Sequence, residues 1–207
     1  MEQLLLFGEM EGRPPLPPPA EERDVVFFAL LLGPQLWAPT ARLVTAQREQ
    51  HGVTGRMRTT DTFHISVLGF GFADELEDDD LALARAVAED VAVEPFDVVF
   101  PELVSWDGKK QPDETCPLVL TCTAGRTEIL RLAAKLTSGL IARGFKPRSF
   151  MPHEPHLTLL YDTVRVPPTP LDPPISAHVN GFALVYSHRG QSRYTVLWPD
   201  AGADARS

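Results

Sequence analysis

The sequence has 207 residues, 43% of them hydrophobic, and a formal net charge of -9 at pH 7. A chain of this length can bury one good-sized core, so we expect one compact domain. The negative charge argues against a broad surface that coats nucleic acid, because such binding needs many Lys and Arg contacts to phosphate. A small basic cleft for one phosphate remains compatible with it. No run approaches the length that crosses a bilayer, and Glu2 stands where a secretory signal would be basic, so we expect a cytoplasmic protein without a membrane anchor.

Proline dominates the segment before the first long apolar run. Residues 14–20 read PPLPPPA, and proline both fixes its backbone angle and removes a hydrogen-bond donor. Residues 1–23 are therefore predicted to be a flexible tail, with folding starting near Asp24. The last residues, 200–207, are predicted to be disordered.

The first half of the folded region alternates between strand patterns and helical patterns. In chain order we predict a strand over 25–32, a helix over 39–50, a strand around His64, a helix over 81–93 behind an acidic cap, and a strand over 95–106. The polar, turn-rich segment 107–115 follows and indicates a connection between two halves.

The second half begins with the same succession of patterns. We predict a strand over 117–124, a helix over 126–145 and a strand around His156. The proline-rich residues 165–174 then indicate a connection, and two antiparallel strands are predicted within 175–188 and 193–200, around a turn at 189–192.

The two halves agree in register. From Val25 to His64 the chain advances 39 residues, and from Leu118 to His156 it advances 38. Each histidine therefore occupies about the same place in its strand-helix-strand unit, which indicates a duplicated, pseudo-twofold architecture.

Both histidines precede a hydroxyl residue by two positions. Side chains alternate between the faces of a strand, so His64 and Ser66 share one face, and His156 and Thr158 share one face in the same way. The apolar residues between them can pack against helices, which leaves the polar pairs to line a cleft between the two halves.

Two facing imidazoles suit phosphodiester cleavage without a metal. One can act as the base for an attacking water and the other as the acid for the leaving alkoxide, near neutral pH. The two hydroxyls can donate hydrogen bonds to the non-bridging phosphate oxygens. Taken singly, each motif is explained as well by a packed strand histidine, because short motifs recur by chance. Two copies at matching positions of a repeated unit favour a site.

The paired motifs resemble those of the 2H phosphoesterases, and within them the bacterial 2'-5' RNA ligase or RNA 2',3'-cyclic phosphodiesterase branch. The resemblance rests on HISV at 64–67 and HLTL at 156–159, together with the opening strand RDVVFFALLL and the GF...PHLTL approach to the second motif. It covers about residues 23–199. It implies an α+β fold with two intertwined lobes, about 24–106 and 115–199, in one domain over 24–199, with antiparallel sheets, outer helices and a central cleft.

The same resemblance implies a reaction and a set of roles. His64 would be the proton donor, His156 the proton acceptor, and Ser66 and Thr158 the phosphate-binding residues, with no metal and no cofactor. The implied reaction is hydrolysis of an RNA terminal 2',3'-cyclic phosphate to a 2'-phosphate, with reversible 2'-5' ligation as a minor activity. RNA ends or small cyclic nucleotides would be the substrates. This chain departs from the family pattern at Ser66, where threonine is commoner, and at Tyr161, where a basic or polar residue is expected.

Residues around the second motif are further candidates for substrate binding and for a metal site. Arg148, with Lys146 and Arg143, could attract RNA phosphates, while Phe150 or Tyr161 could stack on a base. A solvated helix end explains these three basic residues equally well. His153, His156 and Asp162 invite a metal hypothesis, but Pro155 disfavours the helix that would align the two histidines, and no cluster completes the site.

A short apolar motif lies ahead of the proline-rich tether. Residues 3–7 read QLLLF, which resembles the bacterial sliding-clamp-binding pattern Gln-Leu-x-Leu-Phe. The residues that would contact the clamp are Gln3, Leu4, Leu6 and Phe7. Alternatively the tail folds back on its own domain or adds an edge strand.

Two rival functions come from other classes of protein. A nucleotide- or RNA-binding module would keep the cleft without productive geometry, and it would bind nucleotide without forming product. A clamp-tethered adaptor with vestigial chemistry would depend on residues 1–8 instead. No sequence pattern indicates oligomerisation, so a monomer is expected.

Overall fold

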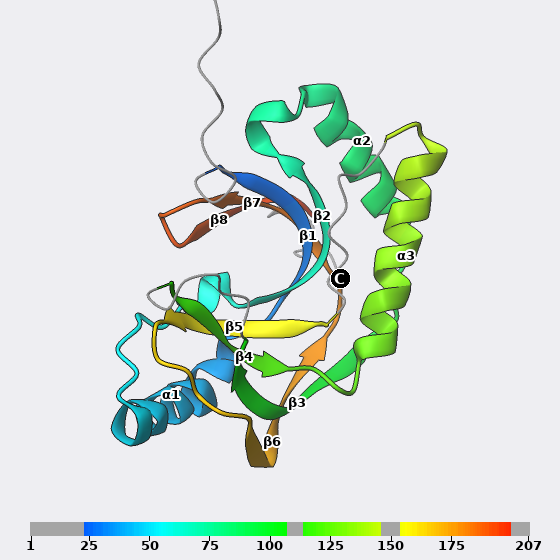
Figure 1. The fold of residues 1–207 in the computed structure, drawn as a ribbon. Helices are drawn as coiled ribbons and strands as arrows, with labels where there is room; N and C mark the ends of the chain where they lie inside the picture. The colour runs from blue at the N-terminus through cyan, green and yellow to red at the C-terminus, as the bar shows by residue number, and fades with distance from the viewer. Residues whose placement is uncertain (1–22, 107–113, 146–153, 200–207) are drawn as a thin grey trace, which may run out of the picture.

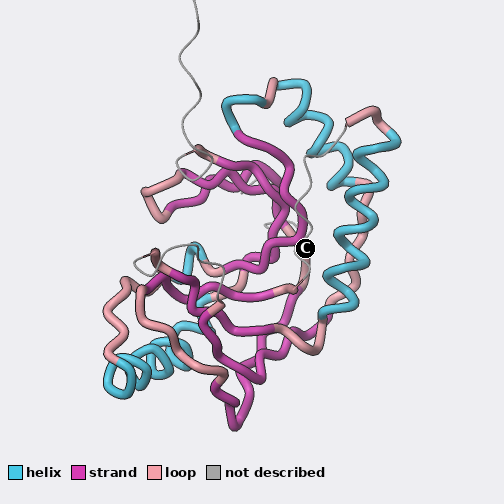
Figure 2. The backbone as a smooth tube through the Cα atoms, in the orientation of Figure 1, coloured by secondary structure: helices cyan, strands magenta, loops and turns pink. Residues whose placement is uncertain are grey.

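The computed structural model describes residues 23–106, 114–145 and 154–199. The predicted flexible tail, the predicted disordered end and most of the predicted connection at 107–115 lie outside these ranges. Two four-stranded antiparallel sheets make up the fold, in the orders β2-β1-β7-β8 and β5-β4-β3-β6. Figure 2 shows the strands of the two sheets at the centre and the helices around them.

The first sheet is built on the apolar run that opens the folded region. β1 (Val25–Leu31) pairs with β2 (His64–Phe72) on one side and with β7 (Ala183–His188) on the other. β8 (Arg193–Trp198) completes the sheet by pairing with β7. Five consecutive residues of β1, from Val26 to Leu30, are buried, as expected for a strand that has neighbours on both sides and cover on both faces.

The second sheet repeats this arrangement. β4 (Cys116–Thr121) lies between β5 (His156–Asp162) and β3 (Phe96–Ser105), and β6 (Thr169–Val179) forms the far edge. β3 comes from the first half of the chain, whereas β7 and β8 of the first sheet come from the second half. The two sheets therefore exchange strands, and each histidine strand lies at an edge of its sheet. The arrangement confirms the predicted α+β class with a duplicated plan.

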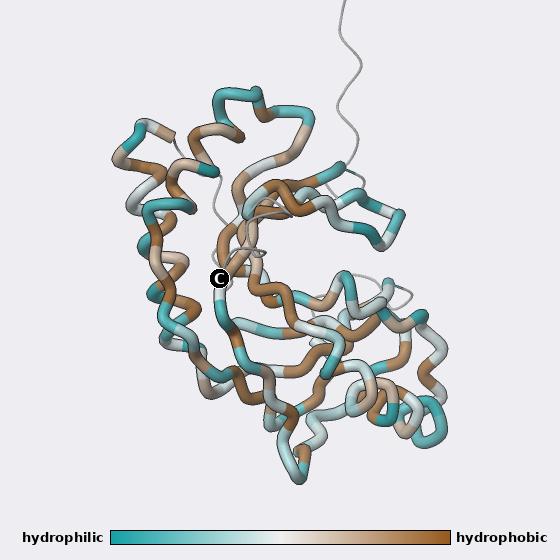
Figure 3. The backbone as a smooth tube through the Cα atoms, turned by 180° about the vertical axis from the view of Figure 1, so that it is seen from behind, coloured by the Kyte–Doolittle hydropathy of each residue, from teal (hydrophilic) through white to brown (hydrophobic). Residues whose placement is uncertain are grey.

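The helices cover the outside of the sheets. Their bounds are Trp37–His51 for α1, Asp78–Glu89 for α2 and Arg126–Ala142 for α3, with short 3-10 turns at Pro34–Leu36 (η1), Thr60–Thr62 (η2) and Ala73–Glu75 (η3). α2 and α3 lie side by side along one flank, and α1 lies beside the second sheet (Figure 1). The backbone is most hydrophobic along the central strands, whereas the helices alternate between hydrophobic and hydrophilic residues (Figure 3). The predicted acidic cap is present, because the Glu77 and Asp80 side chains form a reciprocal capping box at the start of α2.

The proline-rich prediction for residues 165–174 was wrong in part. β6 begins at Thr169 and runs through Pro170, Pro173 and Pro174. An edge strand has one side without a partner, so missing proline N–H groups cost it little. The predicted strand over 175–188 is also two strands, because β6 ends at Val179 in the second sheet and β7 starts at Ala183 in the first.

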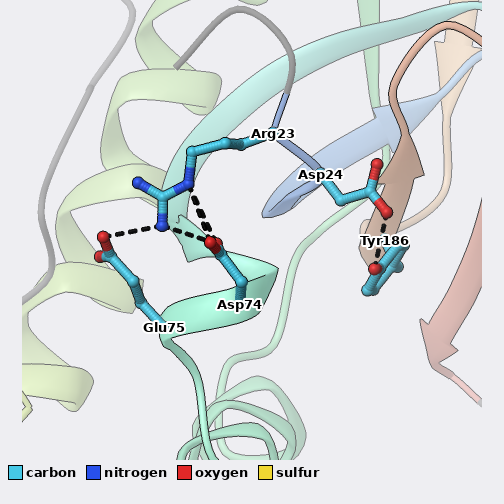
Figure 4. A network of polar contacts seen from close by, with 5 residues as sticks. All are labelled: Arg23, Asp24, Asp74, Glu75 and Tyr186. Atoms are coloured by element: carbon cyan, nitrogen blue, oxygen red, sulfur yellow. Dashed lines mark hydrogen bonds and ion pairs between the residues drawn. The ribbon is translucent and has the colours of Figure 1, made fainter. Parts of the chain in front are cut away.

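The start of the folded domain is fixed by charged and polar contacts (Figure 4). The buried Arg23 guanidinium donates to Asp74 at 2.6 Å and to Glu75 at 2.7 Å, and it lies 3.9 Å from the ring centroid of Phe72. Asp24 accepts a hydrogen bond of 2.7 Å from the Tyr186 hydroxyl. These contacts join the first residues of the domain to the end of β2 and to β7.

Candidate active site

The two histidines occupy equivalent places in the two sheets. His64 is the first residue of β2 and pairs with Leu31, while His156 is the first residue of β5 and pairs with Thr121. Both side chains line one cleft of about 330 Å³, together with Ser66 and Thr158. The structure thus brings together the four residues of the paired motifs.

A second, larger cavity of about 600 Å³ lies between η1, α1 and β6. Its lining among the described residues contains no histidine, so neither of the paired motifs contributes to it. We therefore place the candidate active site in the smaller cleft.

A β-bulge follows the hydroxyl residue in each motif. Pairing with the neighbouring strand skips Val67 in β2 and Leu159 in β5, so each strand gains one extra residue just after Ser66 or Thr158. A bulge shifts the alternation of side chains by one position. As a result the cleft lining continues with Gly69 in β2 and with Tyr161 in β5, three residues after each hydroxyl residue.

Both imidazoles are held by the same local contact. The Nδ1 atom of His64 lies 2.9 Å from the carbonyl oxygen of Thr62, and Nδ1 of His156 lies 2.9 Å from the carbonyl oxygen of Glu154. A carbonyl can only accept, so each Nδ1 carries the proton and donates it. In the neutral form Nε2 of each ring is then left without a proton, which is the state that a general base requires.

The surroundings of the two rings differ. His64 lies between Phe27 and Tyr194, with ring centroids 5.2 Å away in both cases, and the Tyr194 hydroxyl is 3.1 Å from Nδ1. His156 packs against Trp106 at 4.1 Å. His64 is therefore enclosed by two aromatic rings, whereas His156 lies against one.

These surroundings lower the pKa of both histidines. Burial, together with the positive charge of Arg58 and the proximity of His156, lowers the pKa of His64 to about 4 despite the hydrogen bond to Thr62. Burial also lowers the pKa of His156, while the carbonyl and carboxylate of Glu154 act in the opposite direction. Both imidazoles are thus predominantly neutral in the unliganded protein at pH 7, and His64 is the harder of the two to protonate.

The low pKa of His64 predicts that this residue weakens the fold in acid. The unfolded chain has a histidine pKa near 6.5 and binds the proton first, so stability is lost as pH falls from about 6.5 toward 4. Between pH 7 and pH 4.5 we expect the wild type to lose about 2 kcal/mol more unfolding free energy than His64→Gln, which cannot titrate. Urea denaturation of both proteins at the two pH values measures this difference. Equal losses of unfolding free energy in the wild type and His64→Gln would mean that the pKa of His64 is not lowered by folding.

The two hydroxyls are available to a ligand. Ser66 is half-buried and Thr158 is buried, and both line the cleft. Within the described part of the chain neither hydroxyl makes a hydrogen bond. Each can therefore donate to a phosphate oxygen without breaking an existing interaction.

Tyr161 is the one further predicted site residue that the structure describes. It is 46% exposed and lines the cleft. The other predicted residues, Arg148 and Phe150 near the second motif and Gln3, Leu4, Leu6 and Phe7 in the tail, lie outside the described ranges.

Polar and aromatic residues beside the histidines were not predicted from the sequence. Arg58 and Arg189 are part of the cleft lining, Tyr194 contacts His64, and Trp106 packs against His156. Arg58 lies in the segment before η2, and Arg189 lies in the turn after β7. Tyr194 belongs to β8, and Trp106 directly follows β3. Nothing in their local sequence indicates a site, because only strand pairing between the halves brings them to the histidines.

The segment that carries Arg58 is fastened to the end of β5. The buried carboxylate of Asp162 accepts hydrogen bonds of 2.7 Å from the Thr54 amide and 2.5 Å from the Gly55 amide. A third, of 2.7 Å, comes from the Val164 amide. Burial alone would raise the pKa of Asp162, but these amide hydrogen bonds outweigh it and lower the pKa. Gly55 passes so close to β5 that a Cβ atom there would lie 2.2 Å from the carbonyl oxygen of Tyr161.

Neither a ligand cluster for a metal nor a membrane-crossing helix emerges from the described ranges. They contain no group of three or more His, Cys, Asp and Glu side chains placed to hold a metal ion. The metal hypothesis also needed His153, which lies outside them. No helix within these ranges is long and apolar enough to cross a bilayer.

The comparisons with known proteins define the family. The family described as the 2'-5' RNA ligase superfamily matches residues 33–191, which include both histidine motifs. The chain belongs to this superfamily, whose members are 2H phosphoesterases. Among the curated proteins, no match was found.

Solved structures show the same fold. TT0787 of Thermus thermophilus is 23% identical, with a TM-score of 0.60, and the match covers 84% of this chain and 94% of that one. LigT of E. coli, in complex with 3'-AMP, is 21% identical with a TM-score of 0.57, over 84% and 94% of the two chains. LigT in complex with NADP+ is 23% identical, with a TM-score of 0.56 and the same coverage.

Proposed function

We propose that this protein hydrolyses the 2',3'-cyclic phosphate at RNA ends to a 2'-phosphate, using His64 and His156 as an acid–base pair without a metal. One imidazole takes a proton from water as the water oxygen bonds to phosphorus. The bond from phosphorus to the 3' oxygen breaks, and the other imidazole, which enters the reaction as an imidazolium with a proton on Nε2, gives that oxygen its proton. If an RNA 5'-hydroxyl replaces the water, the same pair forms a 2'-5' linkage.

The observation that carries the proposal is the matched placement of the two motifs. His64 and His156 start equivalent edge strands, donate Nδ1 protons to equivalent carbonyls, and line one cleft with two hydroxyls that are free to donate. With Nδ1 engaged, Nε2 of each ring is the atom that exchanges protons with a substrate. Membership of the 2'-5' RNA ligase superfamily supports a phosphoester substrate.

The substrate class is supported by the cleft and by the structural neighbours. A volume of about 330 Å³ is within the range of small-ligand sites. LigT of E. coli, which shares the fold, has been crystallised with 3'-AMP, ATP and phosphate. A nucleotide carrying a terminal cyclic phosphate agrees with the cleft volume and with the ligands of the structural neighbour.

The direct test is incubation of the purified protein, in EDTA, with an oligoribonucleotide that ends in a 2',3'-cyclic phosphate. We expect the 2'-phosphate as the product, resolved from the 3'-phosphate by chromatography. The same oligonucleotide ending in a 3'-phosphate is the control, and it should remain unchanged.

Two results would contradict the proposal. Turnover that disappears in EDTA would mean that the reaction needs a metal. Binding of the oligonucleotide without product would favour a nucleotide-binding module that keeps the cleft but lacks productive geometry.

A further inference from the structure

The four residues of the paired motifs bring no positive charge to the cleft. At pH 7 His64 and His156 are predominantly neutral, and Ser66 and Thr158 carry no charge. A phosphodiester is an anion, and it gains charge as the attacking oxygen approaches, so a site that stabilises it needs a cation or many donors. Among the described residues that line the cleft, the cations with fixed charge are Arg58 and Arg189.

The Arg58 guanidinium is held within the cleft, but not all of its N–H groups make hydrogen bonds. Its Nη1 donates a hydrogen bond of 3.3 Å to the Tyr194 hydroxyl, and Cζ lies 5.6 Å from the ring centroid of Tyr161. Its Nε is buried and has no hydrogen-bond partner within the described part of the chain. A buried donor without a partner is costly, so the guanidinium keeps donor capacity that its contacts within the protein do not use.

The charge of Arg58 acts directly on the reacting groups. The guanidinium is close enough to His64 to oppose its protonation, and it shares the Tyr194 hydroxyl with that ring. No carboxylate forms an ion pair with Arg58 in the described ranges. Its positive charge is therefore available to an anion between the two histidines.

The backbone fixes where this charge lies. The Arg58 amide donates a hydrogen bond of 2.8 Å to the carbonyl of Leu159, the bulged residue that follows Thr158. The preceding residues are held by Asp162. Arg58 thus crosses β5 beside the second motif, whereas Arg189 lies in the exposed turn after β7.

We propose that Arg58 binds a non-bridging oxygen of the scissile phosphate, beside Ser66 and Thr158, and that Tyr194 positions its guanidinium. This assignment rests on the proposed phosphoesterase function. Arginine suits the role because its planar fork of donors matches phosphate and its charge is permanent. Tyr161, which stands where the family carries a basic or polar residue, contributes a ring face for that guanidinium instead of a charge.

The test compares Arg58→Met, Arg58→Lys and the control Arg56→Met, an exposed arginine two residues earlier on the same segment. We expect Arg58→Met to lower kcat/KM on the cyclic phosphate by about 100-fold, with Arg58→Lys between it and the wild type. Affinity for adenosine 2'-monophosphate, measured by calorimetry, should fall by about 10-fold or more in Arg58→Met. Arg56→Met should match the wild type in both measurements.

Titration of His64 by NMR separates an electrostatic role of Arg58 from a purely structural one, because only the electrostatic role changes the pKa of His64. Loss of the neighbouring cation should raise the pKa of His64 in Arg58→Met, because protonation is no longer opposed. Unchanged nucleotide affinity and kcat/KM in Arg58→Met would overturn the assignment. A wild type that is inactive on the cyclic phosphate but binds the monophosphate through Arg58 would refute the proposed reaction alone.

Discussion

Replacing His156 or His64 by alanine is expected to lower kcat/KM for the cyclic phosphate by about 10³-fold or more, because each variant lacks one of the two proton transfers. The hydroxyls and Arg58 remain in both variants, so affinity for adenosine 2'-monophosphate should change far less than turnover. Initial rates with a defined oligoribonucleotide, beside calorimetric titration of the monophosphate, separate the two effects. Thermal unfolding of each variant checks that the fold is intact. Near-normal turnover of His156→Ala would refute the paired mechanism.

The two alanine variants also determine which histidine donates the proton. A phosphodiester with a p-nitrophenolate leaving group needs no proton donor, so the variant that lacks the donor recovers activity on it. The family resemblance implies recovery of His64→Ala. The enclosure of His64 by Phe27 and Tyr194, and the charge of Arg58, act against that assignment, since they lower the pKa of His64 to about 4. Recovery of His156→Ala instead would show that the electrostatics of this cleft reverse the roles.

Local sequence patterns were sufficient for the elements that set the histidine positions. The apolar run of β1, the helical spacing of α3 and the alternation in β2 each depend on residues close in sequence. The matched spacing to His64 and His156 then predicted the duplicated plan. The resemblance carried by the HISV and HLTL motifs predicted the superfamily and its α+β fold.

Features that depend on distant partners were not predictable. Residues 169–174 of β6 resemble a connection because their prolines are tolerated only at a sheet edge, and the sequence does not say which strand forms the edge. The bulges at Val67 and Leu159 are defined by skipped pairing with β1 and β4, so strict alternation could not place Tyr161 in the cleft. Arg58 and Tyr194 are separated by 136 residues, and their contact exists only in the folded chain.

Asp162 supports the site without contacting a substrate, and its replacement is expected to have the largest effect on stability. Three backbone amides, of Thr54, Gly55 and Val164, donate to this one buried carboxylate. Asp162→Ala leaves them facing a cavity, and one buried unpaired donor costs about 1–3 kcal/mol. After partial relaxation we expect a loss of about 3 kcal/mol in unfolding free energy by urea denaturation.

The same substitution should reach the active site, because Asp162 fastens the segment that carries Arg58. Activity of Asp162→Ala, measured well below its unfolding transition, should therefore fall along with stability. Asp162→Asn keeps one acceptor oxygen and should lie between Asp162→Ala and the wild type, while Asp61→Ala removes an exposed carboxylate from η2 as the control. A loss below about 1 kcal/mol in Asp162→Ala would mean that water replaces the carboxylate at those amides. Full activity in a clearly destabilised variant would mean that the position of Arg58 does not depend on Asp162, and that its contacts with Leu159 and Tyr194 alone hold it.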